Sequence, residues 1–159
     1  MTDHDFESTV KRYINVLYRI AFNYLKNKED SEDSVQNVFI RLFHYKKPFK
    51  DEEHLKAWLI RVTINESKRI LTYNKRRPVF DIGKAAKEVY VDDFEKVDFS
   101  IELMKLNPTY STVLYLYYFE GYKAEEIAKL LSKTTVAINL ILSRARKQLK
   151  GFLQEENDE

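Results

Sequence analysis

Apolar residues recur at every third or fourth position along the first half of the chain, which is the spacing of one buried helix face. Residues 5–26 carry one such stripe, formed by Phe6, Val10, Tyr13, Ile14, Leu17, Ala21, Tyr24 and Leu25. A second helix is predicted to begin at the acidic run 29–33 and to bury Val35, Val38, Phe39, Leu42 and Phe43. Residues 44–50 indicate a loop. Asp51 is expected to cap a third helix that buries Leu55, Trp58, Leu59, Val62 and Ile70.

The pattern fades between residues 78 and 100 and then resumes with a second group of helices. Asn107 followed by Pro108 is a specific start signal, since asparagine caps a helix and proline favours its first position. The helix is predicted to end at Gly121 and to carry Val113, Leu114, Leu116, Tyr117 and Phe119. Two more helices are predicted, over 123–131 and 134–152. A short helix, a tight turn and a longer helix with a basic end indicate a helix-turn-helix.

Composition narrows the fold class to all-α. The 159 residues include three glycines and three prolines, too few for the turns of an all-β fold. The absence of cysteine excludes disulfides and thiolate chemistry and favours a reducing cytoplasm. No stretch approaches the ~20 apolar residues of a membrane span, and residues 1–5 are acidic where a signal peptide is basic. We therefore expect neither membrane insertion nor secretion.

The formal net charge of +2 is distributed unevenly along the chain. Residues 1–77 carry sixteen Lys and Arg against eleven Asp and Glu, residues 78–102 carry three against seven, and residues 103–159 carry eight against seven. The local balances are therefore +5, −4 and +1. We predict two small helical domains, 1–77 and 103–153, joined by an acidic linker over 78–102 and followed by an acidic tail over 154–159. The basic clusters suit a polyanionic partner or an ordinary solvated surface.

Two sets of motifs carry a family resemblance. The first set joins residues 18–21, 29–39 and 57–65, and includes Asp33-Ser34-Val35-Gln36 and Ala57-Trp58-Leu59. The second joins residues 120–128 with 142–149, and includes Leu142-Ser143-Arg144-Ala145-Arg146. In this order they resemble a small bacterial RNA polymerase sigma factor of the extracytoplasmic-function type. The resemblance implies an N-terminal region 2 helical bundle and a C-terminal region 4 helix-turn-helix.

The resemblance also implies a function and a set of partners. It implies a transcription initiation factor that binds core RNA polymerase, recognises the −10 and −35 promoter elements and assists DNA melting. The implied partners are the clamp helices of the largest polymerase subunit, the polymerase flap region, promoter DNA and an anti-sigma factor. No cofactor, no metal and no catalytic residue is expected, and the protein is expected in the cytoplasm, associated with the nucleoid.

By the same resemblance, the acidic second helix would contact polymerase through Asp33, Gln36 and Phe39. Composition alone favours a solvated helix start for the acidic run. A metal site is disfavoured, because no nearby histidine joins the acids and sequential carboxylates do not converge on one ion.

The third helix and the loop before it are implied to hold a pocket for a base flipped from the −10 element. Asn65 can pair with a base edge and Phe49 can stack on a base face. The alternative is a polar helix face with an anchored loop. The cations implied to follow phosphates are Arg61, Lys68, Arg69, Arg76 and Arg77. Trp58 fits the apolar stripe, so we expect it in the core.

The last helix is implied to contact the −35 element, with Thr134, Thr135 and Asn139 near the bases. The residues further along, implied to hold the element and its phosphates, are Ser143, Arg144, Arg146 and Lys147. The chain departs from the family in having Ser132 where a glycine is usual, and Asn139-Leu140-Ile141 where a basic-polar run is usual. Leu140 and Ile141 cannot donate hydrogen bonds to bases, although they could touch thymine methyl groups or pack against a partner.

Two other functions remain open at the level of sequence. One is a helical interaction module whose degenerate helix-turn-helix binds a protein in place of DNA, which the Asn139-Leu140-Ile141 departure would suit. The other is a small nuclease or phosphotransferase that uses the acidic run. No glycine-rich phosphate loop and no nucleophile with a base supports the enzyme, and His4, His44 and His54 share no spacing.

Overall fold

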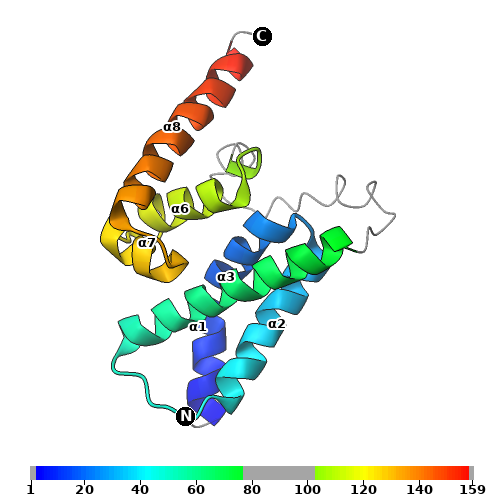
Figure 1. Cartoon of the computed structure of the whole chain (residues 1–159). Helices are drawn as coiled ribbons and strands as arrows, with labels where there is room; N and C mark the ends of the chain where they lie inside the picture. The colour runs from blue at the N-terminus through cyan, green and yellow to red at the C-terminus, as the bar shows by residue number, and fades with distance from the viewer. Residues whose placement is uncertain (1–2, 77–102, 158–159) are drawn as a thin grey trace. The chain divides into compact units, whose positions relative to one another are not determined.

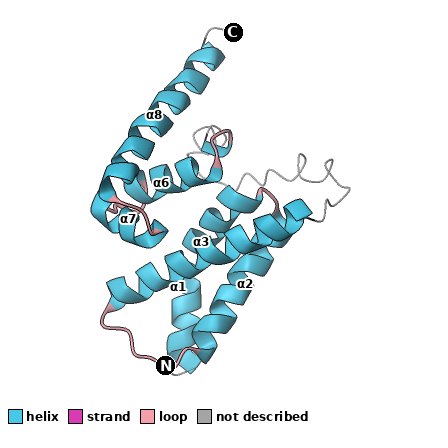
Figure 2. Ribbon diagram, viewed as in Figure 1, coloured by secondary structure: helices cyan, strands magenta, loops and turns pink. Residues whose placement is uncertain are grey.

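The computed structural model describes residues 3–76 and 103–157, and all secondary structure within those ranges is helical (Figure 2). The chain divides into two compact units, Met1–Val89 and Tyr90–Glu159. The predicted all-α fold with two small helical domains is confirmed. The predicted acidic linker over 78–102 lies outside the described residues.

The N-terminal unit is a bundle of three helices, each in contact with the other two (Figure 1). They are α1 (Asp3–Leu25), α2 (Lys28–His44) and α3 (Glu52–Arg76). Asn27 begins α2, because its side-chain oxygen accepts a hydrogen bond from the Asp30 amide at 2.8 Å. Asp51 caps α3 as predicted, accepting from the His54 amide at 2.8 Å.

The core of this bundle differs from the predicted one on all three helices. In α1, Ile14 is 41% exposed, and Phe6 and Val10 are only half-buried. Phe43 is 59% exposed, because it lies in the last turn of α2 with its ring edge against Phe6 of α1. Trp58, Val62 and Ile70 are only half-buried. The turns of α3 direct Leu55 and Leu59 inward as predicted, together with Ile60 and Ile64, which were not predicted. Helical spacing predicted that α3 has a buried apolar face. Buried polar residues of α3, described below, determine which side of the helix that face lies on.

The C-terminal unit contains α6 (Pro108–Tyr118), α7 (Ala124–Leu131) and α8 (Thr135–Asn157). Asn107 caps α6 by accepting from the Tyr110 amide at 2.9 Å, and Pro108 occupies the first helical position, as predicted. The three helices close on one apolar core, to which α6 contributes Val113, Leu114 and Leu116, α7 contributes Ile127, Ala128, Leu130 and Leu131, and α8 contributes Ile138, Leu142, Ala145 and Leu149.

The turn between α7 and α8 is closed by Ser132 in the left-handed conformation, with φ 54° and ψ 45°. The Lys133 amide then donates to the Ala128 carbonyl at 2.9 Å and satisfies the end of α7. Thr134, predicted as the first helical residue, precedes α8. Its hydroxyl accepts from the Ala137 amide at 3.1 Å. At its other end α8 runs to Asn157, five residues beyond the expected end at 152.

Two glycines provide a paired test of the backbone in this unit. Gly121 has φ of 73°, so Gly121→Ala forces a side chain into the left-handed region and should lower the free energy of unfolding by about 1 kcal/mol. Gly151 lies inside α8 with open space around it, so Gly151→Ala should raise it by about 0.5–1 kcal/mol. Denaturant unfolding followed by circular dichroism measures the free energy of unfolding of both variants. Changes of the same sign in the two variants would contradict the described turn.

Candidate functional site

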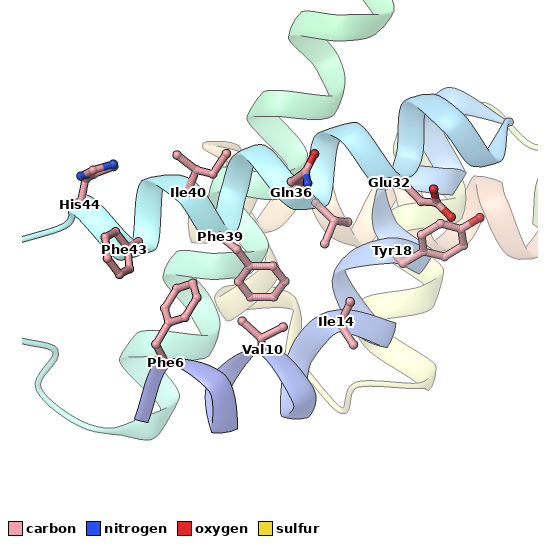
Figure 3. Close-up of a pocket in the computed structure, with 11 residues that line it drawn as sticks. Phe6, Val10, Ile14, Tyr18, Glu32, Gln36, Phe39, Ile40, Phe43 and His44 are labelled. Carbon is pink, nitrogen blue, oxygen red and sulfur yellow. The ribbon is translucent and has the colours of Figure 1, made fainter. Parts of the chain in front are cut away.

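A groove between α1 and α2 is the first candidate binding feature of the N-terminal unit (Figure 3). It has a volume of about 640 Å³, and its apolar lining includes Val10 and Ile14 from α1 and Phe39 and Ile40 from α2. Phe39 is 7% exposed and points from α2 toward Val10. The groove therefore presents a largely apolar floor bordered by a helix whose first turns are acidic.

The exposed ridge of α2 borders this groove. Gln36 lies on the ridge and lines the groove, whereas Asp33 is exposed one turn earlier and its neighbour Glu32 lines the groove. Ile40 and Phe43 are 52% and 59% exposed on the same ridge and were missed as site residues by sequence reasoning. The signal was present in the sequence, since apolar residues four and seven positions after Gln36 continue its face.

Helix α3 carries a stripe of exposed polar side chains away from the bundle. Arg61, Asn65 and Arg76 are exposed, and Lys68 is half-buried. Their spacings of three, four and eight residues place them along one side of the helix. The structure therefore brings four of the predicted −10 residues onto a single surface. Arg77 lies outside the described residues.

Phe49 belongs to an aromatic cluster at the start of α3. Its ring stacks on Tyr45 at 5.1 Å between centroids and meets Trp58 edge-on at 5.6 Å. The ring of His54 contacts Phe49 from a third direction at 5.4 Å, while its Nδ1 accepts from the Lys50 amide at 2.9 Å. Trp58, expected in the core, is half-buried because it anchors this loop.

Trp58 connects the Phe49 cluster to the side of α3 that carries Asn65, because the Phe49 ring packs against Trp58. Asn65 follows Trp58 by seven residues, which is two helical turns or ~10.5 Å along the axis. The cluster and the exposed amide thus lie in line along α3, with Arg61 between them in sequence. This arrangement is compatible with a strand of nucleic acid laid along the helix, which would meet an aromatic surface, a cation and an amide in turn.

Arg69 is held by a carboxylate inside the bundle. Glu66 is 2% exposed and accepts from Arg69 at 2.6 Å, from Asn37 at 3.1 Å and from Arg41 at 3.3 Å. The Arg69 guanidinium is the main cause that holds the pKa of Glu66 below its ordinary value, with Asn37 and Arg41 adding to the effect. Arg69 therefore has a structural partner in addition to the phosphate contact predicted for it.

In the C-terminal unit, the outer face of α8 gathers most of the predicted −35 residues. Asn139, Ser143, Arg144 and Lys147 are exposed on it, and Thr135 is half-buried. Val136, which sequence reasoning did not single out, is 77% exposed on the same face. Val136, Ser143 and Lys147 lie opposite the buried stripe of Ile138, Leu142, Ala145 and Leu149, whereas Thr135 lies beside that stripe.

Arg146 contacts the end of α6. Its guanidinium carbon lies 5.5 Å from the ring centroids of both Tyr117 and Tyr118, and its Nε donates to the Tyr118 hydroxyl. Cation–π contacts of this kind stabilise the packing of α8 on α6. Arg146 is thus assigned a packing contact in addition to the predicted phosphate contact.

Metal clusters and membrane spans are both absent from residues 3–76 and 103–157. Those ranges contain no cluster of three or more His, Cys, Asp or Glu that could hold a metal ion. No helix within them is both long and apolar enough to cross a membrane.

Comparison with known families matches both units. The profile of Sigma-70 region 2 matches residues 9–77, and that of Sigma-70 region 4 matches residues 102–149. Two helical units that match these profiles in this order define a transcription initiation factor. The chain belongs to the sigma factor family of bacterial RNA polymerase and is of the extracytoplasmic-function type. The predicted family and function are confirmed, and the alternative of a protein-binding module is not favoured.

Curated relatives agree over nearly the full chain. The RNA polymerase sigma factor SigV of Bacillus subtilis is 28% identical over 146 residues, which cover 88% of this chain and 86% of SigV. The ECF RNA polymerase sigma-E factor of Haemophilus influenzae is 24% identical over 166 residues, covering 94% of this chain and 87% of that protein.

Solved structures share the fold. The sigma factor RpoE of Bartonella quintana, crystallised with the anti-sigma factor NepR, matches with a TM-score of 0.71 and 19% identity, covering 94% of this chain and 97% of RpoE. CnrH, solved with the cytosolic domain of CnrY, matches with a TM-score of 0.65 and 22% identity, covering 97% of this chain and 90% of CnrH. At these identities the likeness establishes the helical architecture.

Glu66 gives a pH-dependent test of the site's scaffold. Glu66→Gln should lower the free energy of unfolding at pH 7 by about 1–3 kcal/mol, because it weakens bonds to three partners. Since the folded-state pKa of Glu66 lies below its ordinary value of 4.5, its contribution is complete above pH 4.5 and is lost as the pH falls through the folded-state pKa. The difference from wild type should therefore shrink below pH 4.5.

Denaturant unfolding at a series of pH values measures this difference. Glu53→Gln is the matched control, because Glu53 is exposed on the same helix. A gap between wild type and Glu66→Gln that stays constant with pH would contradict a charged Glu66 in the folded state.

Proposed function

We propose that the exposed ridge of α2 and the groove beside it form the contact with core RNA polymerase. The carrying observation is that Ile40 and Phe43 are more than half exposed, although the bundle has an apolar core available to them. Exposed apolar side chains next to polar ones are typical of interaction surfaces. Asp33 and Gln36 supply polar pairing on the same ridge, and Phe39 supports the groove floor. The clamp helices of the largest subunit are the proposed partner.

The outer side of α3 is proposed to hold the −10 element. Asn65 is exposed and can pair with a base edge, and the Phe49 cluster offers an aromatic surface close to Arg61. We propose that Arg61, Lys68 and Arg76 bind phosphates, with Arg77 as a further candidate. Capture of unstacked bases would offset the few kcal/mol lost on unstacking and so assist melting.

The outer face of α8 is proposed to hold the −35 element, with Arg144 and Lys147 on phosphates and Asn139 and Ser143 near the bases. The hydroxyl of Thr134 caps the start of α8 by accepting a hydrogen bond from the Ala137 amide, and Thr135 is the first residue of the helix. The recognition face also carries the exposed apolar side chains of Val136 and Leu140, which cannot donate hydrogen bonds to bases, so we propose that the −10 contacts supply more of the sequence discrimination.

The proposed function also includes a cellular setting and a regulator. The factor acts without catalytic residues of its own, through binding of core polymerase, its flap region included, and promoter DNA at the nucleoid. An anti-sigma factor is a proposed regulator, supported by the resemblance of the fold to RpoE in its complex with NepR.

The polymerase contact is tested by two double variants of the full chain. Asp33→Ala with Gln36→Ala should weaken binding to core polymerase by more than ~1.5 kcal/mol, since truncation leaves polar partners unpaired. Ile40→Ser with Phe43→Ser should weaken it through loss of apolar contact area. Titration of fluorescently labelled protein with core polymerase gives both affinities.

The matched control is Glu53→Ala with Thr72→Ala, which removes an acidic and a neutral polar side chain from exposed positions of α3. It should bind core polymerase as the wild type does. Unchanged affinity in both α2 variants would remove the assignment to this ridge.

The division of DNA contacts is tested by one variant in each unit. Asn65→Ala should cost ~1–3 kcal/mol at one −10 base and relax the preference there. Arg144→Ala should weaken all promoters about equally and reduce the salt dependence by about one phosphate contact. Transcription from promoter libraries randomised at −10 or at −35 separates the two. A −35 consensus as sharp as the −10 consensus in the wild type would contradict this division.

A further inference from the structure

The outer face of the first half of α8 carries two exposed apolar side chains. Val136 is 77% exposed and Leu140, one turn later, is 47% exposed. They lie opposite the buried residues Ile138 and Leu142, so the core of the unit does not include them. Ser143 and Lys147 continue the same line at spacings of three and four residues and are also exposed.

The stretch of chain that contains this apolar pair carries no acidic residue. From residue 127 to residue 154 the chain has no Asp or Glu, and it has six cations, Lys129, Lys133, Arg144, Arg146, Lys147 and Lys150. A charge balance of this kind complements a polyanion. The occupant of the face should therefore carry negative charge along its length and offer small apolar groups to α8.

Duplex DNA meets both requirements, because its phosphates pair with the flanking cations and the thymine C5-methyl is the apolar group exposed in the major groove. We infer that Val136 and Leu140 recognise thymine methyl groups of the −35 element, an inference that rests on the proposed placement of α8 on that element. Neither side chain carries a polar atom that could read any other feature of a base edge.

The spacing of the pair limits which thymines are read. Val136 and Leu140 are four residues apart, which is ~6 Å along the helix axis. Successive base pairs are separated by ~3.4 Å. The preferred −35 element should therefore contain thymines, on either strand, about one or two base pairs apart.

The experiment replaces thymine by deoxyuridine, which removes the methyl group and leaves every hydrogen-bonding atom of the base in place. A preferred −35 sequence is first selected from a randomised duplex library with holoenzyme assembled from the full chain and core polymerase. Each thymine is then replaced singly, and holoenzyme affinity is measured for wild type, for Val136→Ser with Leu140→Gln, and for Leu153→Gln. Leu153 is a matched control, because it is an apolar residue of the same helix that is 38% exposed.

We expect the wild type to lose about four-fold in affinity for each contacted methyl group, the amount that corresponds to one buried methyl or methylene. The loss should be confined to one or two thymines. It should be absent in the double variant, which should bind the thymine and deoxyuridine promoters alike, and should persist in Leu153→Gln.

Three results with promoter DNA would overturn the inference: a selected element without thymine, a wild type indifferent to deoxyuridine at every position, or an equal loss in the double variant. If Arg144→Ala still weakens binding to all promoters, the placement of α8 on DNA stands and only the methyl contact fails. If Arg144→Ala has no effect either, the placement itself fails. A double variant that binds core polymerase more weakly without DNA would identify the pair as a protein contact and likewise overturn the inference.

Discussion

The geometry of the N-terminal unit depends on the carboxylate of Glu66 inside the bundle. A buried charge is costly unless it is paired, and Asn37 and Arg41 of α2 and Arg69 of α3 provide that pairing. The hydroxyls of Ser34 and Ser67, 3.1 Å apart and fully buried, add a second polar contact between the same two helices. Rotation of α3 about its axis would break these bonds. They therefore fix which side of α3 faces outward.

That rotational setting explains which parts of the fold were predictable. Helix ends were predicted well where one residue decides them, as Asp51 and Asn107 do, because a cap is a local interaction. The phase of α3 was predicted only in part, because Glu66 and Ser67 have the character of surface residues until their partners on α2 are known. The error moved Trp58 and Val62 into the expected core in place of Ile60 and Ile64.

The candidate site was likewise predictable only where a residue's placement does not depend on partners from other helices. Exposed cations and Asn65 were identifiable from residue type and motif, since their placement requires only that they lie outside. Arg69 was not separable from the other cations, because Glu66, one turn earlier on α3, has the character of a surface residue until its partners on α2 are known. Arg146 was not separable, because its partner Tyr118 comes from another helix. Val136, Ile40 and Phe43 were missed for the opposite reason: apolar residues at helical spacing suggest a core, and only the closed packing shows them left outside.

Ser132 has a consequence for how the helix-turn-helix meets its duplex. The left-handed region available to a residue with a side chain is narrow, and φ 54° with ψ 45° lies well inside it. A glycine at this corner would have access to a far wider range of backbone angles. The serine thus makes the joint between α7 and α8 stiff, so the angle at which α8 enters a groove is set before binding. Any adjustment of fit then falls on the DNA, and its sequence-dependent flexibility becomes part of promoter choice.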